Sequence, residues 1–507
     1  MNKAEMRTEM SANPSNPNGK GLKTGALSFL SNVTMGVSST APAYSLAATL
    51  GPIAALAAFS TPGIMIVAFI PMLFIAIANY HLNRADPDCG TTFSWVTRAI
   101  GPRAGWMGGW SIIITNILVM PSLADISGRY TFRLLGIADP SAVNIALVGV
   151  AWIVVITTIC YLGIALSVRT QQLLLGAEML ILVAFAITAL VQVYTGRIPT
   201  GAHPVALGWF DPLHIADFGK FTNAMVLAVF IYWGWDSCIS VNEETRNPET
   251  APGQAALVST FILVGLYALV STAAVAAAGS GLFQKNADDV LAPLGQAVLG
   301  PALGKFLILA VLMSALASTQ TSILPAARMA LSMAHAGAFP RRFADIHTRH
   351  LSPGFATLTM GAISTVWYVG LTILSADVLT DSITALGLVI AFYYGLTGFA
   401  CVIFFRREIT GSVRNFISMG LLPATGGIIM ATLLVKSCIA PGEATASQTT
   451  ILGIPGPVAI AAASVLAGII LMLATQWHLP AFFRRKPEVF SARQNQIAPA
   501  PAETGTI

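Results

Sequence analysis

The sequence predicts an all-α integral membrane protein with about twelve transmembrane helices. Two observations support this fold class. Of the 507 residues, 55% are hydrophobic and only 10% are charged, with a mean hydropathy of +0.73, whereas soluble domains contain roughly 25% charged residues. Apolar stretches of about 20 residues, long enough to cross a bilayer, recur along nearly the whole chain. We therefore expect the bilayer to bury most of this sequence.

The predicted spans are separated by short polar turns. In order, they lie near residues 28–55, 61–80, 104–124, 142–161, 171–194, 222–242, 255–278, 303–330, 355–374, 382–404, 416–436 and 457–476. The Asn- and Pro-containing start and the Pro/Ala-rich end have no apolar pattern, so residues 1–25 and 479–507 are expected to be disordered cytoplasmic tails. The start also lacks the compact apolar segment of a cleaved signal peptide.

The distribution of positive charge predicts the orientation, because Lys and Arg accumulate in cytoplasmic loops. With the N-terminus inside, most of the 27 Lys and Arg residues fall on the cytoplasmic side. Seven fall outside: Arg129, Arg133, Arg197, Lys220, Lys285, Lys305 and Lys436. We expect a multi-pass protein of the inner (cytoplasmic) membrane with both termini in the cytoplasm. The net charge of +5 then reflects topology rather than nucleic-acid binding.

Cysteine and histidine usage argues against an enzyme, a metal site or an organic cofactor. The five cysteines are scattered and form no disulfide framework. All seven histidines fall in tails, loops or span ends. No cluster of His, Asp and Glu has catalytic or metal-ligand spacing within the spans.

The first predicted span contains residues that interrupt a helix. It reads FLSNVTMGVSSTAPAYSLAATLG and places the triplet Ser38, Ser39 and Thr40, followed by Pro42, near its middle. Proline lacks an amide proton, clashes with the preceding turn and pushes the residue before it towards extended backbone. We therefore expect a break near Ser38 to Ala41. Because such backbone is tolerated in a bilayer only where protein buries it or it lines a wet cavity, the break indicates a binding site.

The sixth span contains a second interruption. It reads AVFIYWGWDSCISVNEETRNPE, with Gly234 among aromatic residues and Asp236 after it. It lies five helices after the first, so the two interrupted helices enter the membrane from opposite sides. This predicts a LeuT-like pair of inverted five-helix repeats, residues 26–200 and 201–410, followed by two helices within 411–478. Broken helices offer amides to an anion and carbonyls to a cation, which match a zwitterionic amino acid.

Four segments of the chain follow one another in an informative order. They are DCGTTFSWVTRAIGPRAGWMGGW, the aromatic-Gly-aromatic-acid segment YWGWD, NEETRNPETAPGQAA, and AARMALSMAHAGAFP. Together they resemble the amino acid–polyamine–organocation superfamily, in its bacterial amino acid permease branch. The resemblance runs from about Ser28 to Arg407, with two further helices after it. It implies secondary active transport of amino acids or related amines by alternating access, as ion-coupled import or exchange.

The resemblance implies a role for the first interruption. In the family this segment is rich in glycine around a Gly-x-Gly, and its equivalents here are Ser38, Ser39 and Thr40, next to Ala41. Their amides are expected to hold the substrate carboxylate. The hydroxyls narrow the space and add donors, so the side-chain volume accepted by glycine-bearing relatives does not carry over. The alternative is that the hydroxyls serve close helix packing.

The resemblance also implies roles on the sixth span. The carbonyls near Phe230 and Trp233, beside Gly234, should accept from the substrate ammonium, and Phe230 should close over it. Asp236 is costly inside a membrane, by roughly 2.5–3.5 kcal/mol, and is expected to act in gating, in coupling or in pairing with a cationic substrate. The alternatives are a carboxylate that caps the second half of the broken helix and aromatic residues that only pack.

Two sets of residues are candidates for binding a coupling ion. Glu178 lies on the fifth span, where proton-coupled relatives often carry a lysine, so a protonatable carboxylate replaces the usual ammonium. The alternative for Glu178 is an ion pair with an arginine at the inner interface. On the eighth span, Ser318 and Thr319 offer the hard oxygens that sodium prefers, with ordinary helix packing as the alternative. The coupling ion, H⁺ or Na⁺, is left open.

Gate residues are expected on both sides of the site. On the cytoplasmic side these are Glu243, Glu244 and Arg328, joined by Arg246, Arg341 and Arg342; a solvated charged rim is the alternative. On the tenth span, Tyr393 and Tyr394 are candidates for the outer gate, or else packing residues.

Other classes of membrane protein fit less well. A transporter of the major facilitator type would show a charged Gly/Asp/Arg signature after the second span, and NYHLNRADPDCGTT does not match it. A sensor would usually add a soluble domain. A channel stays an alternative, although a broken-helix central site favours occlusion over continuous conduction. Polyamines, other organic cations and nucleobases remain alternative substrates, and the chain is expected to act as a monomer or homodimer.

Overall fold

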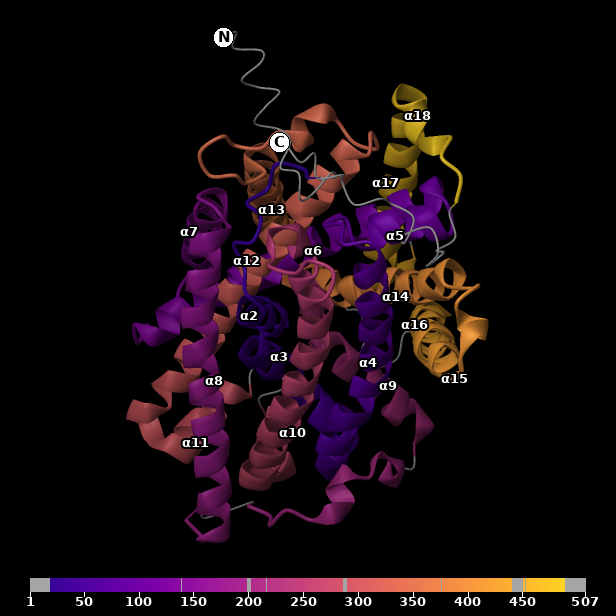
Figure 1. Ribbon diagram of the computed structural model, residues 1–507. Coiled ribbons are helices and arrows are strands. Elements are labelled where there is room, and N and C mark those ends of the chain that lie inside the picture. The colour runs from indigo at the N-terminus through magenta and orange to yellow at the C-terminus, as the bar shows by residue number, and fades with distance from the viewer. Residues whose placement is uncertain are drawn as a thin grey trace, which may run out of the picture.

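The computed structural model describes residues 19–487, apart from residues 138, 198–201, 216, 286–289, 375, 440–449 and 452. Within these ranges the chain is mostly helical, and long helices run side by side through the molecule (Figure 1). A short antiparallel pair of strands, β1 (Thr450–Ile451) and β2 (Ile454–Pro455), precedes the last long helix.

The helices follow one another with short connections. They are α2 (Phe29–Ser39), α3 (Pro42–Ala57), α4 (Thr61–Ala85), α5 (Thr92–Ala99), α6 (Pro102–Leu134), α7 (Ala142–Tyr161), α8 (Ile164–Tyr194), α9 (Phe218–Ile231), α10 (Ala251–Lys285), α11 (Leu291–Leu303), α12 (Lys305–His335), α13 (Gly354–Leu374), α14 (Ala376–Phe404), α15 (Val413–Asn415), α16 (Leu422–Ile439), α17 (Gly456–His478) and α18 (Pro480–Phe483), with the short helices η1 (Ala58–Ser60), η2 (Leu207–Phe210), η3 (Pro212–His214), η4 (Trp235–Cys238), η5 (Asn242–Glu244), η6 (Arg341–Ala344), η7 (Ile409–Gly411) and η8 (Phe416–Leu421).

Ten segments of the described chain are long and apolar enough to cross a membrane, compared with about twelve expected from the sequence. The difference has two causes. The helices α2, α3 and α4 form one apolar segment, Phe29–Ala85, although their residues cover two predicted spans. The helix α9, over the predicted sixth span, has only 14 residues before its regular backbone ends. The helices α5 and α11 were not predicted as spans.

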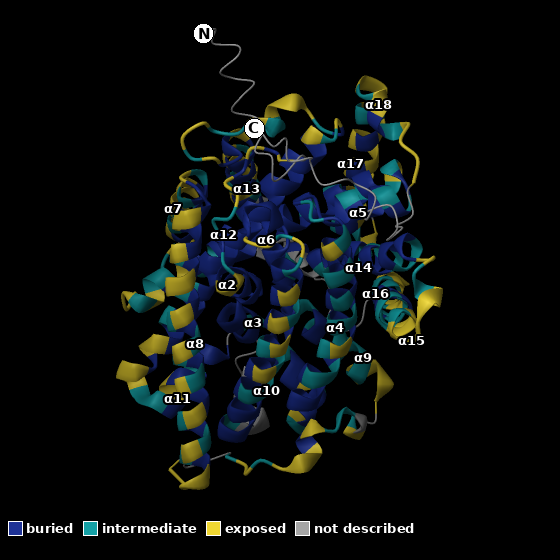
Figure 2. Cartoon of the chain, viewed as in Figure 1, coloured by how far each residue is buried: buried dark blue, intermediate teal, exposed yellow. Residues whose placement is uncertain are grey.

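Burial separates an inner group of helices from an outer one. Within the most apolar 18-residue stretch of each helix, 89% of the residues of α12 and 83% of those of α6 are buried, compared with 17% of those of α17. Figure 2 shows the same contrast, with α6 and α12 dark and yellow residues along α7 and α8. On α8 the exposed residues include Leu173, Leu180 and Ile187, which are 70%, 72% and 54% exposed. Such a large apolar surface is stable only against lipid or another apolar partner.

The predicted tails lie only partly within the described residues. Residues 19–25 are described, and within them Lys20 and Leu22 are buried. The segment continues as an extended strand-like contact, in which the Leu27 amide donates to the Glu244 carbonyl at 3.0 Å. At the other end, α18 buries Phe482. These residues are packed against the helices, which corrects the expectation that all of 1–25 and 479–507 would be disordered; the rest of both tails lies outside the described residues.

Candidate functional site

The first helix interruption falls between α2 and α3, within the range predicted from the sequence. Ala41 has a left-handed backbone with a φ of 47°, and Pro42 begins α3. The hydroxyl of Ser38 donates to the Thr34 carbonyl at 2.7 Å, and that of Thr40 donates to the Val37 carbonyl at 2.8 Å. Two of the three hydroxyls therefore donate to carbonyls of the last turns of α2.

The second interruption follows α9 and touches the first. Gly234 has a φ of 118°, and a Cβ placed there would lie 2.7 Å from the Ser39 carbonyl oxygen. Both the backbone angle and the close approach therefore require glycine. The hydroxyls of Ser39 and Ser237 lie 2.7 Å apart. The structure thus brings together the end of α2 and the start of η4, two segments almost two hundred residues apart in the sequence.

Asp236 lies beside this contact and is held by the tenth predicted span. Its carboxylate accepts from the hydroxyls of Tyr393 at 3.2 Å and Tyr394 at 3.0 Å. The indole of Trp233 donates to the Tyr393 hydroxyl at 2.6 Å, and the ring of Trp235 stacks on Tyr394. The two tyrosines proposed as gate or packing residues therefore position the carboxylate.

A small cavity lined by both polar and apolar residues lies at this carboxylate. It is lined by Thr91, Ile112, Asn116, Trp233, Asp236, Ser237, Ser240, Pro325, Met329 and Tyr393. Asp236 is half-buried, while both tyrosines beside it are buried. Phe230, the predicted covering aromatic, is half-buried near the end of α9 and is not among the lining residues. A polar group in this cavity would meet one carboxylate and several hydroxyl and amide groups.

Glu178 approaches the first interruption from α8. Its side chain is fully buried, and its carboxylate accepts a hydrogen bond of 2.7 Å from the Ala43 amide in the first turn of α3. Among the described residues, its second oxygen, Oε2, has no hydrogen-bond partner. The next amide, that of Tyr44, donates to the hydroxyl of Ser314 at 3.2 Å. Glu178 therefore contacts the N-terminus of α3. Within the described part of the chain, it does not form the ion pair with an arginine that was the alternative.

Of the two hydroxyls on α12 that were predicted to bind sodium, those of Ser318 and Thr319, only that of Ser318 reaches the interruption. Ser318 donates to the Ser39 carbonyl at 3.2 Å. Thr319 instead donates to the Ala315 carbonyl of its own helix at 2.8 Å. Both side chains are buried.

A cluster of buried charges lies beyond the C-terminal end of the predicted sixth span, around η5. Arg328 and Glu244 form an ion pair of 2.6 Å and are each 1% exposed. Next to them, the Lys20 ammonium lies 2.9 Å from Asp88 and 2.5 Å from Glu243. Burial lowers the pKa of Lys20, but the adjacent negative groups outweigh it and raise that pKa well above its ordinary value.

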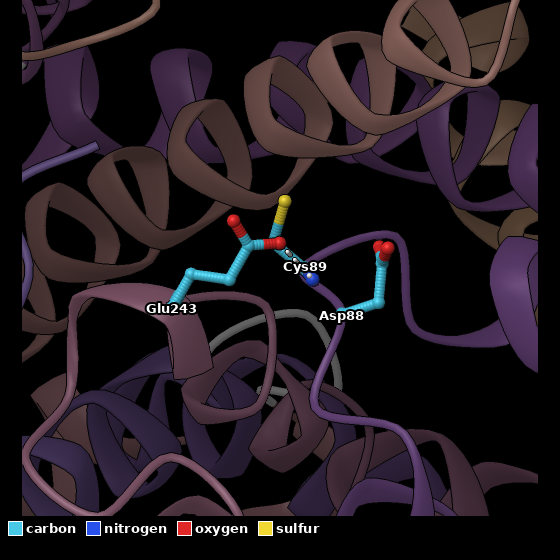
Figure 3. A group of neighbouring side chains, drawn as sticks. All are labelled: Asp88, Cys89 and Glu243. Carbon is cyan, nitrogen blue, oxygen red and sulfur yellow. Dashed lines mark hydrogen bonds between the residues drawn. The ribbon is translucent and has the colours of Figure 1, made fainter. Parts of the chain in front are cut away.

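Figure 3 shows the side chains of Asp88, Cys89 and Glu243, each of which contacts the Lys20 ammonium. Asp88, Cys89 and Glu243 offer ligand atoms within 4.8 Å of one another, which is a spacing a metal ion could use. The Cys89 amide also donates to Glu243 at 3.0 Å. Because Lys20 already supplies a cation to both carboxylates, the structure explains this cluster without a metal.

Sequence reasoning missed Lys20, Asp88 and Cys89 as members of this cluster. The sequence DCG was recognised as part of a family loop, but no periodic pattern links residue 20 to residue 243. Of the other predicted gate residues, Arg246 donates to the Gly25 carbonyl at 3.2 Å. Arg341 and Arg342 are exposed on η6.

Comparison with known proteins gives a consistent result. A family model described as "Amino acid permease" matches residues 27–473. The low-affinity putrescine importer PlaP of Escherichia coli K12 is 22% identical over 81% of this chain and 88% of its own length. The branched-chain amino acid permease BcaP of Bacillus subtilis is 26% identical over 60% of this chain and 66% of its own. The cationic amino acid transporter 3, mitochondrial, of Arabidopsis thaliana is 25% identical over 67% of this chain, which spans 57% of that relative.

Proposed function

The chain belongs to the amino acid permease family, and on this basis we propose that it is a secondary active transporter that moves amino acids or related amines across the cytoplasmic membrane by alternating access. The observation that carries the proposal is the contact between the two helix interruptions, with Gly234 against the Ser39 carbonyl and a small cavity at Asp236. Irregular backbone inside a bilayer is typical of substrate sites in transporters.

The topology we propose has twelve crossings. The helices α2 and α3 together make the first, and α9 with η4 makes the sixth, so that the interrupted helices lie five crossings apart and run in opposite directions. Residues 26–200 and 201–410 then form two inverted repeats, followed by two further helices. The bias of Lys and Arg towards one side supports cytoplasmic termini.

The substrate site in this proposal lies between the two interruptions. Its residues are Ser38, Ser39, Thr40 and Ala41 on one side and Phe230, Trp233, Gly234 and Asp236 on the other. Asp236 binds the substrate ammonium, because it lines the cavity and because, within the described part of the chain, the hydrogen bonds to its carboxylate come from the neutral hydroxyls of Tyr393 and Tyr394. Phe230 closes over the bound substrate as the helices rearrange.

The cytoplasmic gate in this proposal consists of two buried ion pairs, Arg328 with Glu244 and Lys20 with Glu243. Each pair joins segments that must separate when the site opens to the cytoplasm: α12 and η5 in the first, and the N-terminal segment and η5 in the second. Breaking a buried pair is costly, so the closed state is favoured until substrate binding offsets that cost.

Two arrangements support different coupling ions. Glu178 holds the first turn of α3 and can carry a proton, so protonation would weaken its bond to the Ala43 amide. Ser318, with Thr319 next to it, places a hydroxyl on the Ser39 carbonyl, where a sodium ion would find oxygen ligands. We favour proton coupling, since Glu178 is a buried carboxylate with one oxygen unpaired among the described residues.

Uptake into proteoliposomes tests the proposed function. Labelled amino acids and amines are offered with a proton gradient, a sodium gradient or preloaded substrate. Accumulation should be lost in Asp236→Asn and strongly reduced in Phe230→Ala, while Phe306→Ala, a half-exposed aromatic on α12, should retain it. Glu178→Gln should abolish uptake driven by protons; if sodium drives uptake, Ser318→Ala should abolish it instead. Folded protein that accumulates nothing under all three conditions would overturn the assignment.

A further inference from the structure

The amides around the first interruption are already paired, which bears on the kind of substrate the site accepts. Helix N-termini bind anions through free amides. In α3, Pro42 has no amide proton, the Ala43 amide donates to Glu178, and the Tyr44 amide donates to Ser314. The Ser45 amide donates to the Ala41 carbonyl at 2.8 Å. The first turn of α3 therefore offers no free donor to a substrate carboxylate.

The residues before the break give the same result. The Thr40 amide donates to the Val37 carbonyl at 3.2 Å, and the Ala41 amide donates to the Ser38 carbonyl at 3.1 Å. Both are bonds within the last turn of α2. The carboxylate of Glu178 thus takes the place that the carboxylate of an amino acid would need.

Among the described residues, the buried ionisable groups at the two interruptions are acids, and the buried cations lie elsewhere. Among buried side chains in this part of the chain, permanent positive charge is carried by Lys20 and Arg328, and both pair with acids at the cytoplasmic cluster. The lining of the cavity includes one carboxylate, Asp236, and no Lys or Arg. A carboxylate entering the cavity would meet Asp236, with no Lys or Arg in the lining to offset it. Glu178 lies outside this lining, at the first turn of α3.

The ends of the helices add to the negative potential at the site. The negative, carbonyl ends of α2 and α9 both point into the interruption, at Ser39 and Ile231. The positive end of α3 faces the same region, but its Ala43 amide already donates to the carboxylate of Glu178. The backbone and the side chains together favour a cation.

We propose that the central site selects organic amines that carry no carboxylate, with Glu178, in its ionised form, as the resident anion on α3 and Asp236 as the partner of the substrate ammonium. This inference rests on the proposed function and narrows its substrate class. A compound that differs from an amino acid only by loss of the carboxylate is therefore the better substrate, and Glu178 determines this specificity.

The test compares matched pairs of compounds on the full-length protein. Each pair consists of an amino acid and its decarboxylated amine: ornithine and 1,4-diaminobutane, lysine and 1,5-diaminopentane, arginine and agmatine, leucine and 3-methylbutylamine. Binding is measured from the concentration dependence of the thermal unfolding shift, and uptake is measured in proteoliposomes. In at least one pair, the amine should bind at least about tenfold more tightly than its amino acid, since a buried carboxylate left without a donor is costly.

Variants at position 178 test the residue responsible. Glu178→Gln keeps the shape but removes the charge, and it should reduce the preference for the amine by about tenfold in the binding measurement, which does not require uptake. Glu178→Asp retains the charge and should keep the preference. Glu249→Gln, which removes an exposed carboxylate, should leave it unchanged.

The outcomes separate this inference from the proposed function. Uptake of amino acids without uptake of their amines would overturn the inference and leave the permease intact. An amine preference that survives in Glu178→Gln would refute the role of Glu178. If folded protein neither binds nor moves any member of any pair, the proposed function falls together with the inference.

Discussion

Gly234 is the residue at which the two helix interruptions meet. Its φ of 118° is rarely adopted by residues with a side chain, and a Cβ would lie 2.7 Å from the Ser39 carbonyl oxygen. Two separate constraints therefore apply to one position, and relaxing the backbone angle alone would not remove the clash. The same is not true of Gly265 on α10, where a Cβ would meet nothing within 4 Å.

Gly234→Ala should therefore lower the stability by about 1–3 kcal/mol, which is the range for a strained backbone position, and should reduce uptake because the break is displaced. The thermal unfolding midpoint of purified protein and uptake by the same preparation measure these effects. Gly265→Ala should keep both at wild-type levels or slightly raise the midpoint. Equal effects in the two variants would show that helix propensity, rather than the contact with Ser39, is responsible.

A second expectation at this scale concerns the buried pair of Arg328 and Glu244. Arg328→Gln leaves a buried carboxylate without its cation and should destabilise the protein by about 3–5 kcal/mol. The double variant Arg328→Met, Glu244→Met should recover part of the loss, because the orphaned charge is removed as well. Arg342→Gln, at an exposed position on η6, should change stability by less than about 0.5 kcal/mol. Thermal unfolding of the variants in detergent provides the comparison.

At the scale of elements, the N-terminal segment before α2 connects the loop after α4 with η5. Lys20 is the centre of this connection, since its ammonium contacts both Asp88 and Glu243. Burial raises the pKa of Asp88, but the charge of Lys20 outweighs it and the net pKa is below the ordinary value. A depressed acid pKa stabilises the fold above the ordinary acid range, and a raised lysine pKa stabilises it below the ordinary lysine range. The connection should therefore persist across neutral pH.

Lys20→Gln should loosen this segment and expose Cys89, whose sulfur lies 3.5 Å from the Lys20 ammonium. Labelling by a membrane-impermeant maleimide, applied from the cytoplasmic side in a Cys438→Ser background, should increase several-fold, because Cys438 is the exposed cysteine and Cys89 is buried. Lys23→Gln, at an exposed position in the same segment, is the control. Unchanged labelling in Lys20→Gln would show that the segment stays closed without its ion pairs.

Local chemistry explains which elements could be predicted. Pro42 and Gly234 each interrupt a helix through their own backbone, so the positions of both interruptions could be read from the sequence. The partners of Asp236 could not, because Tyr393 and Tyr394 lie far along the chain and reach it only after α14 packs beside η4. The contact of Glu178 with the Ala43 amide escaped for the same reason. The residue was singled out, but its partner is a backbone group that no side-chain pattern marks.

At the scale of the whole molecule, apolar side chains form the outer surface and polar groups lie in the interior. Leu180, near the middle of α8, is 72% exposed, whereas serines, threonines and the acids Glu178 and Glu244 are buried. An apolar outer surface of this size is the reverse of that of a soluble domain and is expected for a protein surrounded by lipid. It also explains why composition alone predicted the fold class.

Leu180→Arg should therefore impair membrane insertion, at a cost of about 2.5–3.5 kcal/mol on insertion scales. The amount of full-length protein in the washed membrane fraction measures the effect. Leu180→Ala, which keeps the position apolar, should accumulate normally. Normal accumulation of Leu180→Arg would indicate that this face of α8 contacts protein or water rather than lipid.

The hydrogen bond from the Ala43 amide to Glu178 has an evolutionary consequence. The negative charge at α3 comes from a side chain on another helix, whereas the two interruptions depend on Pro42 and Gly234. Substrate charge and backbone geometry are therefore under separate genetic control. If Glu178 sets the substrate class as proposed, a lineage with this scaffold would exchange amines for amino acids by replacing one residue on α8, while selection on the residues that shape the break stays the same. Divergence in substrate should thus precede divergence in architecture.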